Sequence, residues 1–464
     1  MKIVGAADFE VWKNMQYTTD KTTKDRAIIA GVCIGRDLDF SRSMKELEGL
    51  CEACDMEVVG QITQSLERAE KGTYMGSGKV TELADAVQTL EATMVVFNDS
   101  RTPSQLRNLS DIVGCAVMDR STLILEIFGR RATTREAQLQ VAVASLQYML
   151  PRLVGLHEAL SRQGGGSGAM SNKGAGETKL ELDRRRLEAR LTELRRELKT
   201  VASERETQRK KRATSGCIRV ALVGYTNAGK STLLNGLIDL EEKDASGRSN
   251  LNSDKEFERV EERKVMEKDM LFATLDTTVR RIEVEGHQPL LVSDTVGFID
   301  KLPHHLVEAF SSTLEEACEA DVLLHVVDAS DEDHKRHMEV TTSTLDDLGA
   351  GSIPTIYVYN KADRCTNITE LPLVKKEGDE VRIYLSAKKG KGLGELLELI
   401  EEALSDDYVT CKFMVPFSAG NVVSYMKENA VILSTEYTAD GTLIEVKCSK
   451  ADFGRYKEYL ETDK

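Results

Sequence analysis

The 464-residue sequence has little proline, only 7 residues, and it lacks any apolar run of membrane-spanning length. Its N-terminus, Met-Lys-Ile-Val-Gly-Ala-Ala-Asp, lacks the apolar segment of a signal peptide. The nine cysteines are odd in number and scattered, which is typical of a reducing compartment. We therefore expect a cytoplasmic globular protein without stable membrane insertion, whose length is enough for about three domains.

An excess of positive charge is also lacking. The chain has 62 Lys and Arg against 77 Asp and Glu, a formal charge of −15, which argues against nonspecific binding of nucleic acid by the whole surface.

Metal-site patterns are sparse as well. Cys51 and Cys54 form the one C-x-x-C, with no second pair at zinc spacing. His334 and His337 lie in a polar stretch after an expected strand, where a solvated surface is the simpler interpretation.

One phosphate-binding motif is complete. Residues 224–232 read Gly-Tyr-Thr-Asn-Ala-Gly-Lys-Ser-Thr and fit G-x-x-x-x-G-K-[ST]. The apolar run 218–223 predicts a buried strand before the motif, and residues 232–238 can open a helix after it. Glycines let the backbone approach a phosphate, and a helix N-terminus supplies free N–H groups. The predicted binding residues are Gly224, Asn227, Ala228, Gly229, Lys230, Ser231 and Thr232, with Lys230 on the β- and γ-phosphates and Ser231 on Mg²⁺.

Three further segments follow in the order that a GTPase requires. Asp294-Thr-Val-Gly297 ends an apolar run and predicts a carboxylate that holds Mg²⁺ through water and an N–H for the γ-phosphate. Asn360-Lys361-Ala-Asp363 predicts guanine selection, because a carboxylate accepts hydrogen bonds from guanine N1–H and its 2-amino group. The third segment, expected to offer an N–H to guanine O6, comprises Ser386, Ala387 and Lys388.

The residues alone do not identify the threonine that would sense the γ-phosphate, since Thr274, Thr277 and Thr278 all lie between the phosphate loop and Asp294. Phe298 stands where many GTPases carry a water-positioning Gln, so we expect slow intrinsic hydrolysis; packing alone would also explain it. Asn227 could mark a K⁺ site or only shape its loop.

Around this site the sequence predicts an α/β fold in four parts. Alternating strand-like and helix-like runs predict a small α/β domain over residues 1–120, in which Gly76-Ser-Gly-Lys79 imitates a phosphate loop but lacks the Ser or Thr after the lysine. A helical hairpin is expected over 121–215. A P-loop GTPase domain follows over 216–405, with a charged insertion at 241–268, and a small α/β appendage over 406–464.

The hairpin prediction depends on two apolar stripes with 4-3 spacing. The first comprises Leu139, Val143, Leu146 and Leu150, before Pro151, which should end or bend its helix. The second comprises Leu187, Leu191, Leu194, Leu198 and Val201. A glycine-rich loop at 163–177 would form the tip. The second helix is rich in arginine, which suits either a solvated face or an RNA partner.

These residues resemble those of the HflX family of ribosome-associated GTPases, over about residues 20 to 405. The resemblance is carried by Met75–Val80, Pro103–Leu109, Asp119–Leu125, Arg130–Ala132, Tyr148–Leu153, Gly174–Thr178, Asp183–Arg186, Phe272–Asp276, Asp294–Ile299, Leu302–His304 and Leu323–Asp328. It implies a GTPase, with Mg²⁺ and possible K⁺, that docks on the large ribosomal subunit and its RNA. It also implies a hairpin tip near the peptidyl-transferase centre, the splitting or rescue of stalled ribosomes, and Thr274 as a catalytic and Mg²⁺-binding switch residue alongside Lys230 and Gly297.

The sequence departs from the family pattern in three places. Thr277-Thr-Val-Arg280 replaces Pro-Thr-Thr-Arg, the glycines of the tip loop are spaced differently, and the 241–268 insertion is added. We expect a monomer that hydrolyses GTP to GDP and phosphate, slowly when alone and faster on the ribosome. Two alternatives stay open: a signalling GTPase whose protein effector binds the insertion, and a ribosome-assembly or RNA-binding scaffold that does not turn over GTP.

Overall fold

A computed structural model describes residues 24–35, 37–163, 173–213, 217–246, 270–272, 275, 277–301, 311–366, 368, 370–378, 380–405, 408–438 and 441–461. These residues form an α/β protein, as the sequence predicts, with one parallel sheet, one mixed sheet and one antiparallel sheet. Among the described residues, no helix is both long enough and apolar enough to cross a membrane.

The N-terminal domain is a four-stranded parallel sheet in the order β2-β1-β3-β4, with helices on its faces. Its central strands are buried along most of their length, which requires cover on both faces. The elements are β1 (Arg26–Ile34), α2 (Phe40–Ala53), β2 (Glu57–Leu66), α3 (Ser77–Thr89), β3 (Met94–Phe97), α4 (Pro103–Val113), β4 (Ala116–Asp119) and α5 (Arg120–Arg131).

Local sequence explains several boundaries in this domain. Gly76 lies at the N-cap of α3, so Gly76-Ser-Gly-Lys79 is the start of a helix. Thr102 and Gln105 form a capping box that begins α4. Gly114, with φ of 75°, ends α4, and the last strand of the sheet begins two residues later, at Ala116.

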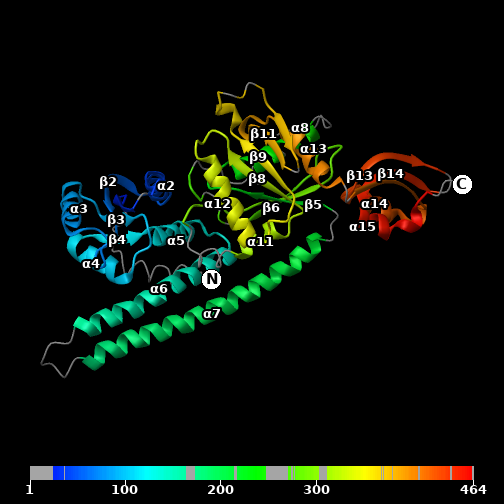
Figure 1. The fold of residues 1–464 in the computed structure, drawn as a ribbon. Helices are drawn as coiled ribbons and strands as arrows, with labels where there is room; N and C mark the ends of the chain where they lie inside the picture. The colour runs from blue at the N-terminus through cyan, green and yellow to red at the C-terminus, as the bar shows by residue number, and fades with distance from the viewer. Residues whose placement is uncertain are drawn as a thin grey trace. The chain divides into compact units, whose positions relative to one another are not determined.

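Two long helices, α6 (Arg135–Gln163) and α7 (Lys173–Ala213), lie side by side as an antiparallel pair in Figure 1. Four members of each predicted stripe meet in one apolar seam, and Leu187 is not among them. Its members are Leu139, Val143, Leu191 and Leu194, with Leu146, Leu150, Leu198 and Val201 packed against them. Pro151 lies inside α6 and does not end it, because a helix that is packed along one face tolerates the loss of one backbone hydrogen bond. Of the predicted tip loop, residues 164–172 lie outside the described residues and 173–177 begin α7.

A seven-stranded sheet forms the second domain, in the order β10-β11-β9-β8-β5-β7-β6. Only the two edge strands, β10 and β6, run antiparallel to their neighbours. The elements are β5 (Ile218–Val223), α8 (Lys230–Ser246), β6 (Thr278–Ile282), β7 (Leu290–Asp294), α11 (Ser311–Cys318), β8 (Val322–Asp328), α12 (His334–Asp347), β9 (Thr355–Asn360), β10 (Leu373–Glu377), β11 (Glu380–Tyr384) and α13 (Leu393–Ala403). The charged insertion starts inside α8, and residues 247–268 lie outside the described residues.

The C-terminal appendage is a three-stranded antiparallel sheet in the order β12-β14-β13. It comprises β12 (Tyr408–Val415), α14 (Gly420–Asn429), β13 (Val431–Tyr437), β14 (Thr442–Ser449) and α15 (Lys450–Arg455). Two contacts fasten β14 to the seven-stranded domain. Gln288 Nε2 donates to Lys447 O at 2.8 Å, and Lys447 Nζ lies 3.0 Å from Glu401 Oε2.

The chain divides into two compact units that do not follow its linear order. One unit joins residues 1–203 with the short pieces Met270–Leu275 and Asp300–Phe310. The other unit comprises Glu204–Asp269, Asp276–Ile299 and Ser311–Lys464. Two pieces that follow the phosphate loop in sequence therefore pack with the N-terminal domain.

Candidate nucleotide site

The phosphate loop connects β5 to α8, and its two glycines have no room for a side chain. Gly224 has a φ of 147°, and a Cβ there would lie 2.3 Å from Val326 O. Gly229 has a φ of 94°, and a Cβ there would lie 2.4 Å from Asn360 Nδ2. The loop is thus shaped by close backbone approach to β8 and to the end of β9, and only glycine fits at both positions.

Lys230, the first residue of α8, is buried beneath the loop. Its Nζ donates to Gly224 O and Tyr225 O, both at 3.0 Å. Burial lowers the pKa of Lys230 to about 8, against the opposing attraction of Asp294. Added phosphate charge would stabilise an ammonium group held this way, because it would replace the stabilisation by water that burial has removed.

Ser231 and Asp294 come together as a pair of oxygen ligands. Ser231 Oγ donates to Asp294 Oδ2 at 2.6 Å, and Asp294 is buried at the end of β7. Hydroxyl and carboxylate oxygens are the ligands that Mg²⁺ prefers, so this donor set fits the ion. Thr274 lies outside the described residues, whereas Thr278 is the first residue of β6 and is paired with Asp294 in the sheet.

The segment after Asp294 lies directly on the phosphate loop. Thr226 N donates to Phe298 O at 2.8 Å, and Phe298 N donates to Gly224 O at 3.1 Å. A Cβ on Gly297 would lie 2.8 Å from Thr226 Cα and 3.0 Å from Lys230 Nζ. Gly297 is therefore the residue that allows this close approach, beside the lysine that would bind the γ-phosphate.

The Phe298 side chain packs in an apolar cluster with Ala221, Val223 and Leu314. It is 3% exposed, so it cannot reach a nucleotide by a simple rotation. A phenyl ring also offers no hydrogen bond to a water molecule. In this conformation, therefore, the residue after D-x-x-G serves packing and leaves the attacking water without a side-chain partner at that position.

Asn360 joins the base-recognition loops to the phosphate loop. Its Nδ2 donates to Ala228 O at 3.1 Å, and its Oδ1 accepts from Ala387 N at 3.1 Å. Lys361 has a φ of 58°, and its Nζ donates to Asn227 O at 2.8 Å. One amide side chain and one lysine thus hold three separate loops together at the carboxyl edge of the sheet.

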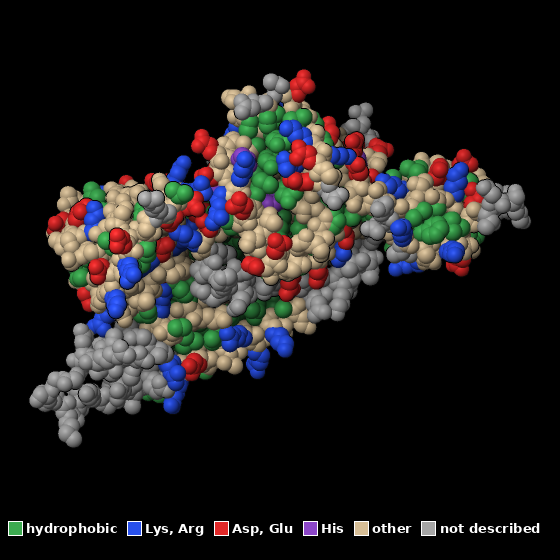
Figure 2. Space-filling model, viewed as in Figure 1, with side chains coloured by type: hydrophobic (Ala, Val, Ile, Leu, Met, Phe, Trp, Pro, Cys, Tyr) green, Lys and Arg blue, Asp and Glu red, His purple; other side chains and the backbone are tan. Residues whose placement is uncertain are grey.

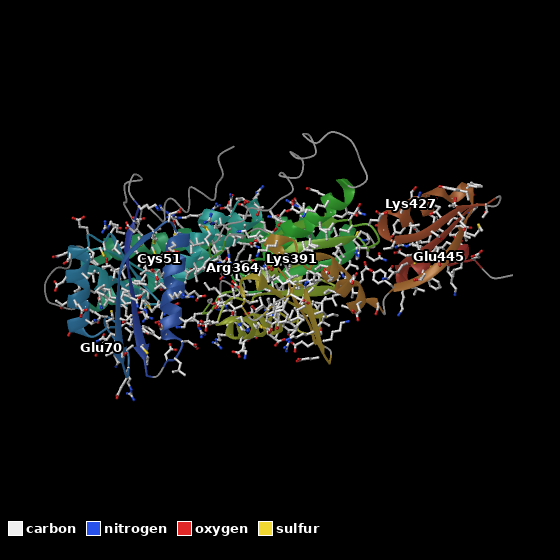
Figure 3. The ribbon with its side chains drawn as sticks, turned by 90° about the horizontal axis from the view of Figure 1, so that it is seen from above. Cys51, Glu70, Arg364, Lys391, Lys427 and Glu445 are labelled. Carbon is white, nitrogen blue, oxygen red and sulfur yellow. The ribbon has the colours of Figure 1, made fainter. Side chains whose placement is uncertain are left out.

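Asp363 is held ready for a base. Ser386 Oγ donates to Asp363 Oδ1 at 2.7 Å, and Lys389 Nζ lies 2.9 Å from Asp363 Oδ2. The hydrogen bonds from Lys389 and Ser386 lower the pKa of Asp363, so it is an anion at neutral pH. Figure 3 labels Arg364 and Lys391, which belong to the loops after β9 and β11 that bring these groups together. Lys388, the last predicted base contact, lies in the same short helix as Lys389.

Several residues with clear contacts to the site were not predicted to belong to it. Asp328, at the end of β8, forms an ion pair with Lys361 at 2.8 Å. Lys389 is the cation beside Asp363. His337 was predicted to lie on a solvated surface, but its side chain is only 18% exposed and stacks on the Tyr225 ring of the phosphate loop, with 3.8 Å between ring centroids. An acidic residue at the end of a strand that follows the phosphate loop is the one pattern that could have indicated Asp328.

Burial lowers the pKa of His325, inside β8, to about 4, and the charge of nearby Lys230 adds to this effect. His325 is therefore neutral at physiological pH. A neutral imidazole next to a buried ammonium avoids two like charges in one apolar site.

A separate groove of about 690 Å³ lies beside α12, β9 and β11. It shares no residue with the nucleotide site, and its floor includes Tyr357 and Tyr359. Figure 2 shows apolar side chains along this part of the seven-stranded domain, bordered by charged ones. Tyr359 is stacked with Tyr384 of β11, with 4.6 Å between ring centroids.

Three successive parts of the chain match family models of GTP-binding proteins. Residues 41–129 match a family model described as a GTP-binding GTPase N-terminal region, and residues 131–212 match the corresponding middle region. Residues 219–361 match a model described as a 50S ribosome-binding GTPase. A GTP-binding protein from Sulfolobus solfataricus, solved with GDP, has a TM-score of 0.41 at 19% identity, over 83% of this chain and 99% of that one.

Two relatives show how far the similarity extends. GTPase HflX of Alkalihalophilus pseudofirmus is 41% identical over 414 residues, covering 89% of this chain and 90% of the relative. GTPase HflX of Escherichia coli is 35% identical over 432 residues, covering 93% and 95%. The loops predicted to bind guanine and phosphate are assembled at one sheet edge, and relatives of this similarity extend along nearly the whole chain. The chain belongs to the HflX family of GTPases, and the reaction of its nucleotide site is the hydrolysis of GTP.

Proposed function

We propose that this GTPase binds the large ribosomal subunit and its RNA as a GTP-dependent switch, and that it splits or rescues stalled ribosomes. The observation that carries the proposal is the match of the GTPase domain to a 50S ribosome-binding model, in a chain whose nucleotide loops are intact. The cycle would run from GTP-bound docking to hydrolysis and release of the GDP form, with the protein acting as a monomer.

In the nucleotide site, the base and the phosphates would be recognised separately. Asp363 would accept from guanine N1–H and the 2-amino group, while Asn360 holds its loop against Ala228. Ala387 N–H, which donates to Asn360 Oδ1 in the structure, lies on the adjoining loop and would have to turn toward guanine O6 or be shared with it. Lys230 would transfer its hydrogen bonds from Gly224 O and Tyr225 O to the phosphates, and Gly297 N–H would contact the γ-phosphate.

Mg²⁺ would be held by Ser231, through water by Asp294, and by Thr274 once the γ-phosphate is present. Bound there, the ion would neutralise charge that builds up on the phosphate oxygens. Asn227 would contribute to a K⁺ site against the phosphates. Its backbone oxygen accepts from Lys361 Nζ, so the loop that carries it is already fixed in place.

Hydrolysis by the protein alone would be slow, because the Phe298 ring is packed in the core and cannot orient water. A partner must then supply or order the missing group, and the ribosome is the partner proposed here. The dependence on a partner couples GTP turnover to docking, which is what a switch requires.

The arginine-rich helix α7 supports an RNA partner. Arg195 and Arg196 are exposed on it, and within the described part of the chain neither forms an ion pair. Arg190 and Arg184, by contrast, lie 2.6 and 3.4 Å from glutamates on the same helix. Exposed arginines can bind phosphate oxygens at little cost, because no internal partner has to be displaced.

The proposal is tested by measuring GTP turnover with the protein alone, with intact ribosomes and with large subunits. We expect strong stimulation by large subunits that is lost in Lys230→Ala. A variant lacking residues 163–176 then separates docking from a later step: unchanged binding with lost subunit separation would place the tip in the later step.

Equal turnover in every mixture would overturn the ribosomal proposal and favour a GTPase with a protein effector. Deletion of residues 247–268 provides the second comparison, since ribosome binding should survive it. Loss of ribosome binding on that deletion would identify the insertion as the docking element instead.

A further inference from the structure

The carboxyl edge of the N-terminal sheet has the layout of a ligand site. Open parallel sheets bind ligands where the strand order reverses, beyond the carboxyl ends of the strands. Here the order β2-β1-β3-β4 reverses between β1 and β3, and Asn98 follows β3 directly. Asn98 and the neighbouring Asp119 and Arg120, at the end of β4, are buried polar residues.

A piece of the chain's own backbone occupies this edge. Arg120, whose side chain is 2% exposed, donates from Nη2 to the carbonyl oxygen of Asp300 at 3.2 Å. Its Nη1 donates to Asn98 Oδ1 at 3.2 Å and to Ser43 O at 3.4 Å, and Glu46 is its ion-pair partner. Asp300 thus receives a hydrogen bond from a guanidinium that β3, α2 and α5 hold in a fixed orientation.

Lys301 continues the same contact. Its Nζ lies 3.3 Å from Asp99 Oδ1, one residue beyond Asn98, and its backbone has a φ of 56°. A non-glycine residue in that conformation is uncommon and is kept only where surrounding contacts determine it. Asp300 and Lys301 belong to the same compact unit as Arg120 and Asp99.

A second piece, which precedes Asp294 in sequence whereas Asp300 follows it, is anchored in the same unit. Phe272 is 2% exposed, with a φ of 53°, and its ring meets the Phe128 ring of α5 edge-on, 4.7 Å between centroids. Leu271 lies against Gly49 of α2, where a Cβ would come within 3.2 Å of it. Leu271 and Phe272 therefore lie against α2 and α5, whereas Asp300 and Lys301 are bound by Arg120 of α5 and by Asp99.

We propose that the carboxyl edge of the N-terminal sheet is a receptor for the Asp300–Lys301 backbone, and that Arg120 is a positioning residue which disfavours GTP relative to GDP. Only Phe298 and Ile299 separate Gly297 from Asp300, so the Cα atoms of Gly297 and Asp300 can lie at most about 11 Å apart. Anchoring Asp300 therefore restricts where Gly297 and Phe298 can move.

The direction follows from the contacts of Phe298. With Asp300 anchored, Phe298 pairs with the phosphate loop at Gly224 and Thr226, and Gly297 lies beside Lys230. A γ-phosphate must enter between Lys230 Nζ and Gly297 N–H, so this pairing has to loosen for GTP but not for GDP. Weakening the Arg120 or Lys301 contact should then favour GTP selectively.

The test is the affinity of the full-length protein for GDP and for a non-hydrolysable GTP analogue, measured by nucleotide fluorescence without ribosomes. We expect Lys301→Ala and Asp99→Asn to bind the analogue about 3-fold more tightly, and Arg120→Lys about 10-fold, with the GDP affinity unchanged. Lys79→Ala is the matched control, because it removes an exposed ion pair, Lys79–Glu82, from the same domain.

Equal changes for both nucleotides, or no change in Lys301→Ala and Asp99→Asn, would overturn the proposal. If Arg120→Lys lowers the melting temperature, the proposal is judged on Lys301→Ala and Asp99→Asn alone. These two residues lie at a more exposed part of the contact, so their substitution should disturb folding less. The measurement involves no ribosome, so its outcome is independent of the proposed ribosomal function.

Discussion

Lys230 combines two demands that conflict in the free protein. It must be positively charged to bind phosphates, yet burial has lowered its pKa to about 8 from an ordinary value of 10.5. Two backbone carbonyls and the nearby Asp294 are its partners in the structure. A bound nucleotide adds phosphate charge, which raises the pKa of the lysine again.

We therefore expect GDP binding to take up a proton. Because the free lysine is about half protonated at a pH of about 8, the uptake should be about 0.5 proton there, about 0.9 near pH 9 and about 0.1 near pH 7. Titration calorimetry in buffers of different ionisation enthalpy measures it directly. An uptake that stays constant across this range would contradict the lowered pKa of Lys230.

Residue identities in the nucleotide site are largely readable from the sequence, because each loop is a short local motif. Asn360 and Asp363 lie on one such loop, and their roles follow from their own chemistry. Lys389, Asp328 and His325 are different, since their importance comes only from the residues that the fold brings next to them. No spacing rule relates Lys389 to Asp363 across 26 residues.

At the scale of elements, the α6–α7 hairpin shows where periodicity succeeds. Both apolar stripes were readable because a helix repeats them every three to four residues. The edge strands β6 and β10 could not be predicted from periodicity, since neither carries a strong period-2 pattern and all five residues of β10 are exposed. Such strands form because a neighbouring strand offers hydrogen bonds, which is a tertiary cause.

Leu194 lies at the centre of this seam and is 1% exposed. Leu194→Ala should destabilise the hairpin by about 2–4 kcal/mol, the cost of lost burial plus the cavity left behind. Hydrogen exchange of the α6 and α7 backbone amides measures the loss. Leu182→Ala is the control, since Leu182 is 51% exposed and the change should cost less than about 0.5 kcal/mol. Equal effects at the two positions would contradict a seam centred on Leu194.

At the scale of the whole molecule, two compact units predict two unfolding events. The phosphate and base loops belong to the unit that contains β5 through α13. A ligand stabilises the unit that binds it, by about 2.7 kcal/mol at a concentration 100 times its dissociation constant.

In calorimetry, GDP should therefore raise the midpoint temperature of one unfolding transition by about 5–10 °C and leave the other midpoint nearly unchanged. Lys230→Ala should show no such shift, because it removes the main phosphate contact. Two transitions that rise together by the same amount would mean that the units unfold as one.

The interleaved order of the two units has a consequence for how the chain is made and cut. The N-terminal unit takes its last piece from Asp300–Phe310, so during synthesis it cannot be complete until some 310 residues have been translated. By then a stretch of the second unit, from Glu204 onward, has already emerged without its partners. No single cleavage point separates the two units intact. A cut after residue 203 separates the first unit from its pieces Met270–Leu275 and Asp300–Phe310, and a cut after residue 310 separates the second unit from Glu204–Asp269 and Asp276–Ile299.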